Sequence, residues 1–269
     1  MTEVDKSRLI DLDEVVATKF KGKKIPGSVV RFLKKFIHQD FMNSIIGKNG
    51  DGIEFCEGVI RDLNVTLDVK GLENVPADGT LYTFASNHPL GGVDGVALAS
   101  VIGRKFGSVR MLVNDFLMFI KPLAPLCVPI NKMGGQVRNL PRLIDEAFKS
   151  GEQMLIFPAG LCSRKIDGKV QDLPWTKTFI NKSVESRRAI VPVHFIGQNS
   201  KRFYRVANLC KKLKLKLNIA MFMLPDEMFK ARNSHFTIIF GKPVPVETFD
   251  SSITPLEWAA EVRKQVYEL

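Results

Sequence analysis

The stretch TLYTFASNHPLGGVDG, residues 80–95, decides the expected fold, because it joins a strand, a turn and a helix. Residues 80–86 are rich in aromatic and β-branched side chains, which is typical of a buried strand. Pro89, Gly91 and Gly92 allow a sharp turn, and helical character begins at Gly95. A strand of this kind delivers the turn to the carboxyl edge of a sheet, where α/β proteins place their sites.

Further short β-rich runs alternate with helical windows on both sides of this stretch. These runs are residues 65–69, 108–113, 153–158, 189–195, 215–224 and 235–240. Such alternation predicts an α/β fold, with a mixed, mostly parallel central sheet flanked by helices. The last helix is marked by Thr254 as N-cap, Pro255 at its first position and Glu257 completing a capping box.

The N-terminal part has a different pattern, that of one amphipathic helix with a basic polar face. Its apolar residues at helical spacing are Val29, Val30, Phe32, Leu33, Phe36, Ile37, Phe41 and Ile45, and Gly47 ends it. Its basic residues are Lys19, Lys21, Lys23, Lys24, Arg31, Lys34 and Lys35. This combination fits a helix on anionic headgroups as well as an ordinary helix packed on the protein. We expect residues 1–64 to form this segment and residues 65–269 to form the α/β domain.

Composition narrows the classes of partner. The 39 Lys and Arg against 28 Asp and Glu give a net charge of +11, which favours acidic partners. A second basic stretch, residues 201–216, suits lipid headgroups, an acidic carrier protein or a solvated helix face. No secretory signal or spanning segment is evident, and no nucleic-acid-binding motif supports that class. We therefore expect a cytoplasmic protein, peripheral on the inner face of the membrane.

His88 and Asp94 are the candidate catalytic pair. A curled turn would bring the carboxylate to the imidazole, giving a general base and the group that orients it. The same turn could direct backbone N–H groups at an oxyanion. The alternative is that Asp94 only caps the following helix. The cysteines at 56, 127, 162 and 210 show no disulfide or zinc spacing, and we expect reduced thiols and no metal. Cys162 offers a less favoured covalent alternative.

Four blocks in order resemble the glycerolipid acyltransferase superfamily, which contains the lysophosphatidate acyltransferases, and more closely its bacterial hemolysin-like branch. They are NHPLGGVDG (87–95), CVPINK (127–132), FPAGLCSRK (157–165) and IVPVHF (190–195). The resemblance makes His88 the catalytic histidine and Asp94 its partner. Expected substrate-binding residues are Asn87, Gly91, Gly92, Lys132, Gly160, Ser163 and Arg164. For Arg164 and Lys132 a solvated surface position remains the alternative.

Two departures from the family pattern bear on the dyad and on the acceptor. Five residues separate His88 from Asp94, where most of the family has four. Ala159 stands where phosphate-acceptor enzymes carry glutamate. The hemolysin-like branch includes enzymes that acylate amino-acid-containing lipids, so the resemblance points to a lyso-aminolipid as much as to lysophosphatidate. Arg164 could grip a carboxylate or a phosphate.

The sequence therefore predicts a lipid acyltransferase without a cofactor. It would move a fatty acyl group from an acyl thioester, carried by acyl carrier protein or CoA, to the hydroxyl of a lyso-lipid, with an N-acyl amino acid lipid among the candidate acceptors. The alternatives are acylation of 1-acylglycerol-3-phosphate, N-acylation of an amine, and a non-catalytic protein that binds anionic lipid.

Overall fold

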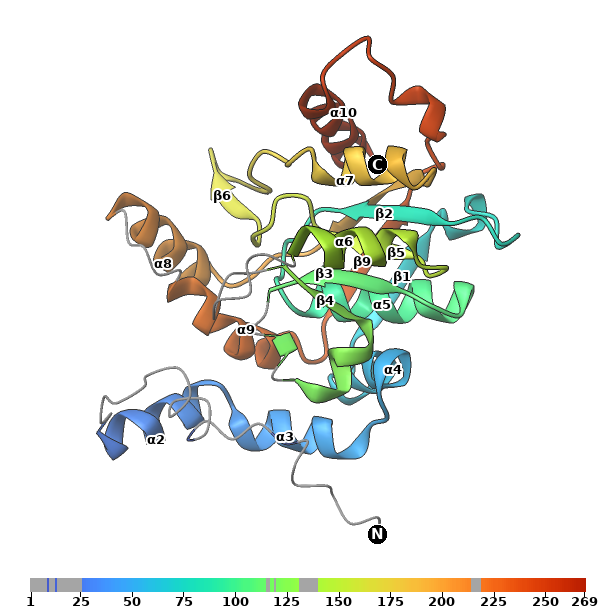
Figure 1. Cartoon of the computed structure of the whole chain (residues 1–269). Coiled ribbons are helices and arrows are strands. Elements are labelled where there is room, and N and C mark those ends of the chain that lie inside the picture. The colour runs from blue at the N-terminus through green and yellow to red at the C-terminus, as the bar shows by residue number, and fades with distance from the viewer. Residues whose placement is uncertain are drawn as a thin grey trace.

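The computed structural model describes residues 9, 13, 26–114, 117–118, 120–130, 140–213 and 219–269. Within them a seven-stranded sheet lies between layers of helices (Figure 1). Its strands are β1 (Thr66–Lys70), β2 (Tyr82–Ser86), β3 (Arg110–Val113), β4 (Cys127–Pro129), β5 (Met154–Ile156), β8 (Ala189–Ile196) and β9 (His235–Phe240). The spatial order β1-β9-β8-β2-β5-β3-β4 puts β2 in the middle. Neighbouring strands are parallel except β8 and β9, which confirms the predicted mixed, mostly parallel sheet.

Helices cover both faces of the sheet, as the sequence predicts. One face carries α4 (Gly52–Asp62) and α5 (Val93–Phe106). The other carries α6 (Leu140–Lys149), α7 (Thr178–Glu185) and α10 (Pro255–Glu268). Beside these layers lie α2 (Gly27–Phe36), α3 (Gln39–Lys48), α8 (Lys201–Lys212) and α9 (Leu224–Lys230) (Figure 1). The predicted cap of α10 is present, with a full capping box between Thr254 and Glu257.

Alternation along the central strands divides the core between the two faces. Phe84 of β2 and Leu155 of β5 belong to the cluster under α4 and α5, whereas Ala85 and Ile156 belong to the cluster under α6, α7 and α10. Successive strand residues point to opposite faces, so a central strand covered on both sides must be apolar throughout. All of β2 is buried, which makes it a rigid base for the turn that follows it.

The N-terminal helical segment departs from the single helix that the periodicity predicts. His38 has a φ of 50°, in the left-handed region, and it separates α2 from α3. Ile45 and Ile46 of α3 are buried in the same core cluster as α4 and α5. The break lets α3 pack on the domain while α2 takes another direction (Figure 1). Residues 19–24, with their predicted basic cluster, lie outside the described residues.

One local prediction differs from the structure. The strand expected at 215–224 is wrong for its described part, because Ile219–Met223 form a 3-10 helix that leads into α9. Ala220 and Met223 pack against Phe203 and Tyr204 of α8, so this segment covers α8 instead of extending the sheet. A small antiparallel hairpin, β6 (Arg164–Ile166) and β7 (Lys169–Gln171), is not among the predicted strands.

In the described ranges, no helix has the length and apolar character needed to cross a bilayer.

Candidate active site

Asn87 fixes the point where the chain leaves the sheet after β2. Its Nδ2 donates to the carbonyl oxygen of Phe195 at 2.9 Å, and its Oδ1 accepts from the N–H of Phe195 at 2.7 Å. The side chain is buried. Because both polar ends of the amide pair with β8, Asn87 supports the scaffold and is not free for the substrate contact that the sequence suggested.

The turn after β2 is folded around the carboxylate of Asp94, in the first turn of α5. The groups that donate to this carboxylate are the backbone N–H groups of Leu90 (2.8 Å), Gly91 (3.2 Å), Gly92 (3.0 Å) and Gly95 (2.9 Å). Gly91 has a φ of +76°, and a Cβ there would lie 2.1 Å from the sulfur of Cys162. These amides are therefore occupied by Asp94, which corrects the expectation that they would hold an oxyanion or that Gly91 and Gly92 would bind substrate through them.

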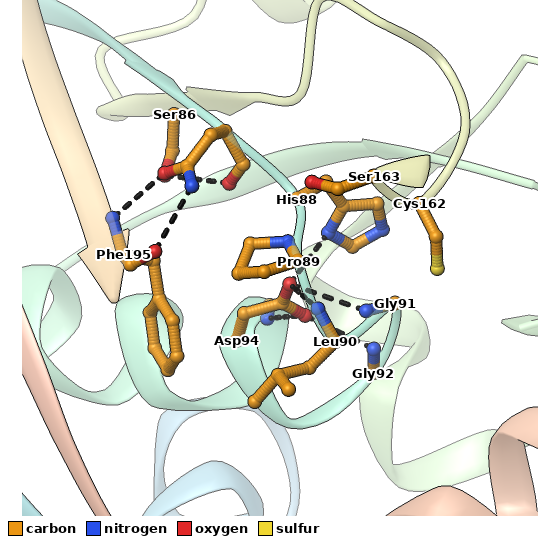
Figure 2. A network of polar contacts seen from close by, with 12 residues as sticks. Ser86, His88, Pro89, Leu90, Gly91, Gly92, Asp94, Cys162, Ser163 and Phe195 are labelled. Carbon is orange, nitrogen blue, oxygen red and sulfur yellow. Dashed lines mark hydrogen bonds and ion pairs between the residues drawn. The ribbon is translucent and has the colours of Figure 1, made fainter. Parts of the chain in front are cut away.

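His88 and Asp94 come together as the sequence predicts. His88 Nδ1 lies 3.0 Å from Asp94 Oδ2 (Figure 2), and the imidazole is 18% exposed whereas the carboxylate is fully buried. The ring of Phe157 stacks on the imidazole with a centroid separation of 3.9 Å. No described residue pairs with the second ring nitrogen, Nε2. The pair thus presents an oriented imidazole whose Nε2 can meet an incoming hydroxyl.

The surroundings adjust the proton affinities of both groups. Burial disfavours the imidazolium, but the charge of Asp94 and its contact with Nδ1 outweigh burial and raise the pKa of His88. Burial also favours the protonated form of Asp94, yet His88 and the backbone N–H groups outweigh it and lower the pKa of Asp94. A basic imidazole beside a carboxylate that stays ionised is the arrangement that general-base catalysis requires.

The block FPAGLCSRK packs directly beside the dyad. Gly160 turns the chain after β5 with a φ of +67°. The N–H of Ser163 donates to the carbonyl oxygen of His88 at 2.8 Å. Arg164 is half-buried, and one of its terminal nitrogens donates to the carbonyl oxygen of Cys162 at 2.6 Å. The positive charge of Arg164 opposes protonation of His88, which places the guanidinium within electrostatic reach of the site.

Cys162 does not join the dyad as a reactive group. The thiol of Cys162 is buried, and burial raises its pKa far above the usual range. Because a thiolate is the nucleophilic form, this environment argues against the covalent alternative. Lys132 lies outside the described residues. In the described part of the chain, no group of His, Cys, Asp and Glu side chains is arranged to hold a metal ion.

Three residues outside the predicted set also shape the site. Phe157 stacks on the imidazole. Asn199 donates through Nδ2 to the carbonyl oxygens of Pro89 and Leu90, which holds the turn from the β8 side. Asp172 accepts a hydrogen bond from the N–H of His88 at 3.2 Å. Asp172 and Asn199 are distant from His88 in sequence and belong to no recognisable motif, so only the fold reveals them.

Comparison with known proteins agrees with this chemistry. The acyltransferase family model matches residues 14–269. Two relatives named lyso-glycine lipid O-acyltransferase are 52% identical (Bacteroides thetaiotaomicron) and 49% identical (Phocaeicola vulgatus). Each alignment covers 97% of this chain, and 97% and 95% of the relatives, respectively. A crystal structure of the 1-acyl-sn-glycerophosphate acyltransferase PlsC from Thermotoga maritima aligns with a TM-score of 0.49 and 18% identity, over 95% of this chain and 87% of that one. The family match and the two relatives show that this chain belongs to the acyltransferase family.

Proposed function

We propose that this acyltransferase moves a fatty acyl group from an acyl thioester to the hydroxyl of a lyso-aminolipid, with a glycine lipid as the favoured acceptor. The observation that carries the reaction is the His88–Asp94 pair, with Nε2 of His88 left for a hydroxyl. The acceptor class is supported by the two relatives named lyso-glycine lipid O-acyltransferase. Acyl carrier protein or CoA would carry the thioester.

The dyad would act as follows. Nε2 of His88 takes the proton of the acceptor hydroxyl while the oxygen attacks the thioester carbonyl carbon. The tetrahedral intermediate collapses, the carbon–sulfur bond breaks, and the imidazolium returns the proton to the departing thiolate. Asp94 remains ionised and stabilises the imidazolium from Nδ1. The products are an ester and a free thiol, and no further reactant is consumed.

Arg164 is the proposed anchor for the acceptor headgroup. Its hydrogen bonds to other described residues, the carbonyl oxygens of Cys162 and Ser163, use only one terminal nitrogen. The remaining guanidinium edge can pair with a carboxylate as well as with a phosphate. Ala159 stands where the phosphate-acceptor pattern has glutamate, so this chain departs from that pattern five residues before Arg164. A singly charged headgroup such as a glycine carboxylate is the acceptor that we propose for Arg164.

We expect an N-(hydroxyacyl)glycine to be acylated at least as efficiently as lysophosphatidate when both compete in one assay with palmitoyl-CoA. Arg164→Ala should raise the KM for the glycine lipid more than it lowers kcat, if the contact is equal in ground and transition states. Thiol release and the two esters are measured together. Lys165→Ala is the matched control, because Lys165 is the exposed neighbour on the same strand. A clear preference for lysophosphatidate would refute the aminolipid assignment.

We also propose that α2 and α8 hold the enzyme on an anionic membrane surface on the cytoplasmic side. Phe32 of α2 is 64% exposed, and Leu209 and Leu213 at the end of α8 are 53% and 58% exposed. Basic residues flank these apolar side chains, namely Arg31, Lys34 and Lys35 on α2, and Lys201, Arg202, Arg205 and Lys212 on α8. Phe36 of α2 packs against the cluster that contains Phe203 of α8, so both helices meet the same group of apolar side chains. Apolar side chains among cations are typical of a surface that enters anionic headgroups.

Binding of the protein to vesicles of phosphatidylglycerol and phosphatidylcholine is expected to weaken as salt rises, because exposed charges are screened over about 10 Å at 0.1 M. Replacing Phe32, Leu209 and Leu213 by alanine should weaken cosedimentation further. Leu256→Ala is the control, because Leu256 is 56% exposed on α10, away from these helices (Figure 1). Equal binding of the triple variant and the wild type would show that α2 and α8 are ordinary surface helices without a role in membrane binding.

A further inference from the structure

Asp172 is a buried acid that the dyad chemistry leaves unexplained. It follows β7 and is 1% exposed, more than eighty positions along the chain from the histidine it contacts. Its Oδ1 accepts from the N–H of His88 at 3.2 Å and from Ser163 Oγ at 2.5 Å. Its Oδ2 accepts from Trp175 Nε1 at 2.9 Å. A buried carboxylate is costly unless its oxygens are satisfied, and these donors satisfy both of them.

These contacts close a ring around the backbone of His88. The N–H of His88 donates to Asp172, the hydroxyl of Ser163 donates to the same oxygen, and the N–H of Ser163 donates back to the carbonyl of His88. Both polar groups of the His88 main chain are thereby fixed. We propose that Asp172 is a positioning residue that holds the backbone of His88, with Ser163, so that Nδ1 faces Asp94 and Nε2 faces the acceptor. This inference rests on the proposed function, because it takes His88 as the base.

The C-terminal helix holds Asp172 in turn. The N–H of Asp172 donates to the hydroxyl of Tyr267 at 2.7 Å, and Arg263 donates to the carbonyl oxygen of Asp172 at 2.7 Å. The guanidinium of Arg263 also lies over the ring of Tyr267. The main chain and the side chain of Asp172 are therefore both fixed by hydrogen bonds. A residue that positions another residue must itself be held in place in this way.

Asp172 also acts on His88 through its charge. The charged groups that face the imidazole are Asp94 from α5, Asp172 after β7 and Arg164 from β6; the carboxylates favour the imidazolium, whereas the guanidinium opposes it. Burial raises the pKa of Asp172 itself, against the opposing effect of its hydrogen-bond donors. Removal of this negative charge should lower the pKa of His88, an effect that a residue serving only to support the fold would not produce.

The decisive variant is Asp172→Asn, assayed with palmitoyl-CoA and an N-(hydroxyacyl)glycine. We expect kcat to fall by about 10- to 100-fold, because a small displacement of a catalytic group has a cost of this order. The acidic limb of the pH profile of kcat/KM should move to lower pH, because His88 then stays neutral at lower pH than in the wild type. NMR titration of the His88 imidazole, one of 4 histidines, should show the same shift without any turnover. Asp167→Asn, at the exposed turn of the same hairpin, removes an equal charge and should change neither quantity.

Ser163→Ala tests the other half of the ring. It removes the hydroxyl donor but keeps the charge of Asp172, so kcat should fall while the His88 titration stays near that of the wild type. A folded Asp172→Asn protein with kcat within about twofold of the wild type and an unchanged titration would overturn the inference. If that variant does not fold, an unaffected Ser163→Ala enzyme overturns it instead. A wild-type protein without transfer activity contradicts the proposed function, and the imidazole titration then decides the role of Asp172 alone.

Discussion

Replacing His88 by alanine is expected to lower kcat/KM by about 10² to 10⁴-fold while the protein stays folded. That is the range a positioned general base contributes. The wild-type kcat/KM should rise with pH through the pKa of His88, which Asp94 raises despite burial, because only the neutral imidazole accepts the proton. Thiol release from palmitoyl-CoA measures the loss, and circular dichroism reports the fold. His235→Ala, at an exposed histidine on β9, is the matched control.

Asp94→Asn extends this test to the partner. In the chymotrypsin-type triad the equivalent change costs about 10⁴ in kcat. Here the Asp94 carboxylate also accepts hydrogen bonds from backbone N–H groups of the turn. In Asp94→Asn, the NH₂ group of the new amide would face one of these N–H donors and could not accept from it. We therefore expect a loss at least as large as in His88→Ala, together with a lower melting temperature. Near-normal turnover in either folded variant would remove the dyad from the mechanism.

Arg188→Ala is expected to lower the free energy of unfolding by about 3 to 5 kcal/mol, the range for uncompensated buried polar and charged groups. Arg188 is 0% exposed, and burial lowers its pKa to about 10, so it remains a cation at neutral pH. Its guanidinium donates to the carbonyl oxygens of Tyr82, Phe148, Ser150 and Glu152. Without Arg188, these four carbonyl groups lose a hydrogen-bond donor that links the segments before β5 and β8 to the start of β2.

Urea unfolding measures this loss directly. Arg187→Ala is the control, because it removes the same charge from the adjacent, exposed position and should change stability little. Arg188 lies at the amino ends of the strands, opposite the dyad. The folded Arg188→Ala protein should therefore show the same NMR titration of the His88 imidazole as the wild type. Equal midpoints for the two variants would show that the buried guanidinium does not hold these segments together.

Local patterns in the sequence were enough to predict the strand, the turn and the dyad. Residues 80–95 contain an apolar run, turn-forming residues and a helix start within a few positions, so short-range chemistry determines their structure. Helical periodicity likewise predicted apolar faces for α2 and α3, but it could not predict their break. The left-handed conformation of His38 occurs together with tertiary contacts, in which its Nε2 lies 2.9 Å from Asp226 and its ring stacks on Phe229.

The finer roles of the site residues depend on contacts across the fold. The pattern around Asn87, Gly91 and Gly92 does not reveal that their amide groups are used by β8 and by Asp94. Asp172 meets His88 only because the hairpin of β6 and β7 folds back beside the turn that follows β2, and such a short hairpin has no strong periodicity. Residues 215–224 have strand composition, yet packing against α8 makes Ile219–Met223 helical.

The amide of Asn87 imitates a peptide group. With one donor and one acceptor aimed at Phe195, it adds a rung to the β2–β8 ladder that the main chain does not supply. The pairing with β8 is thus continued by a side chain past Ser86, the last residue of β2 that pairs through its main chain. The point at which the chain turns toward His88 is therefore held by a side chain as well as by the strand itself.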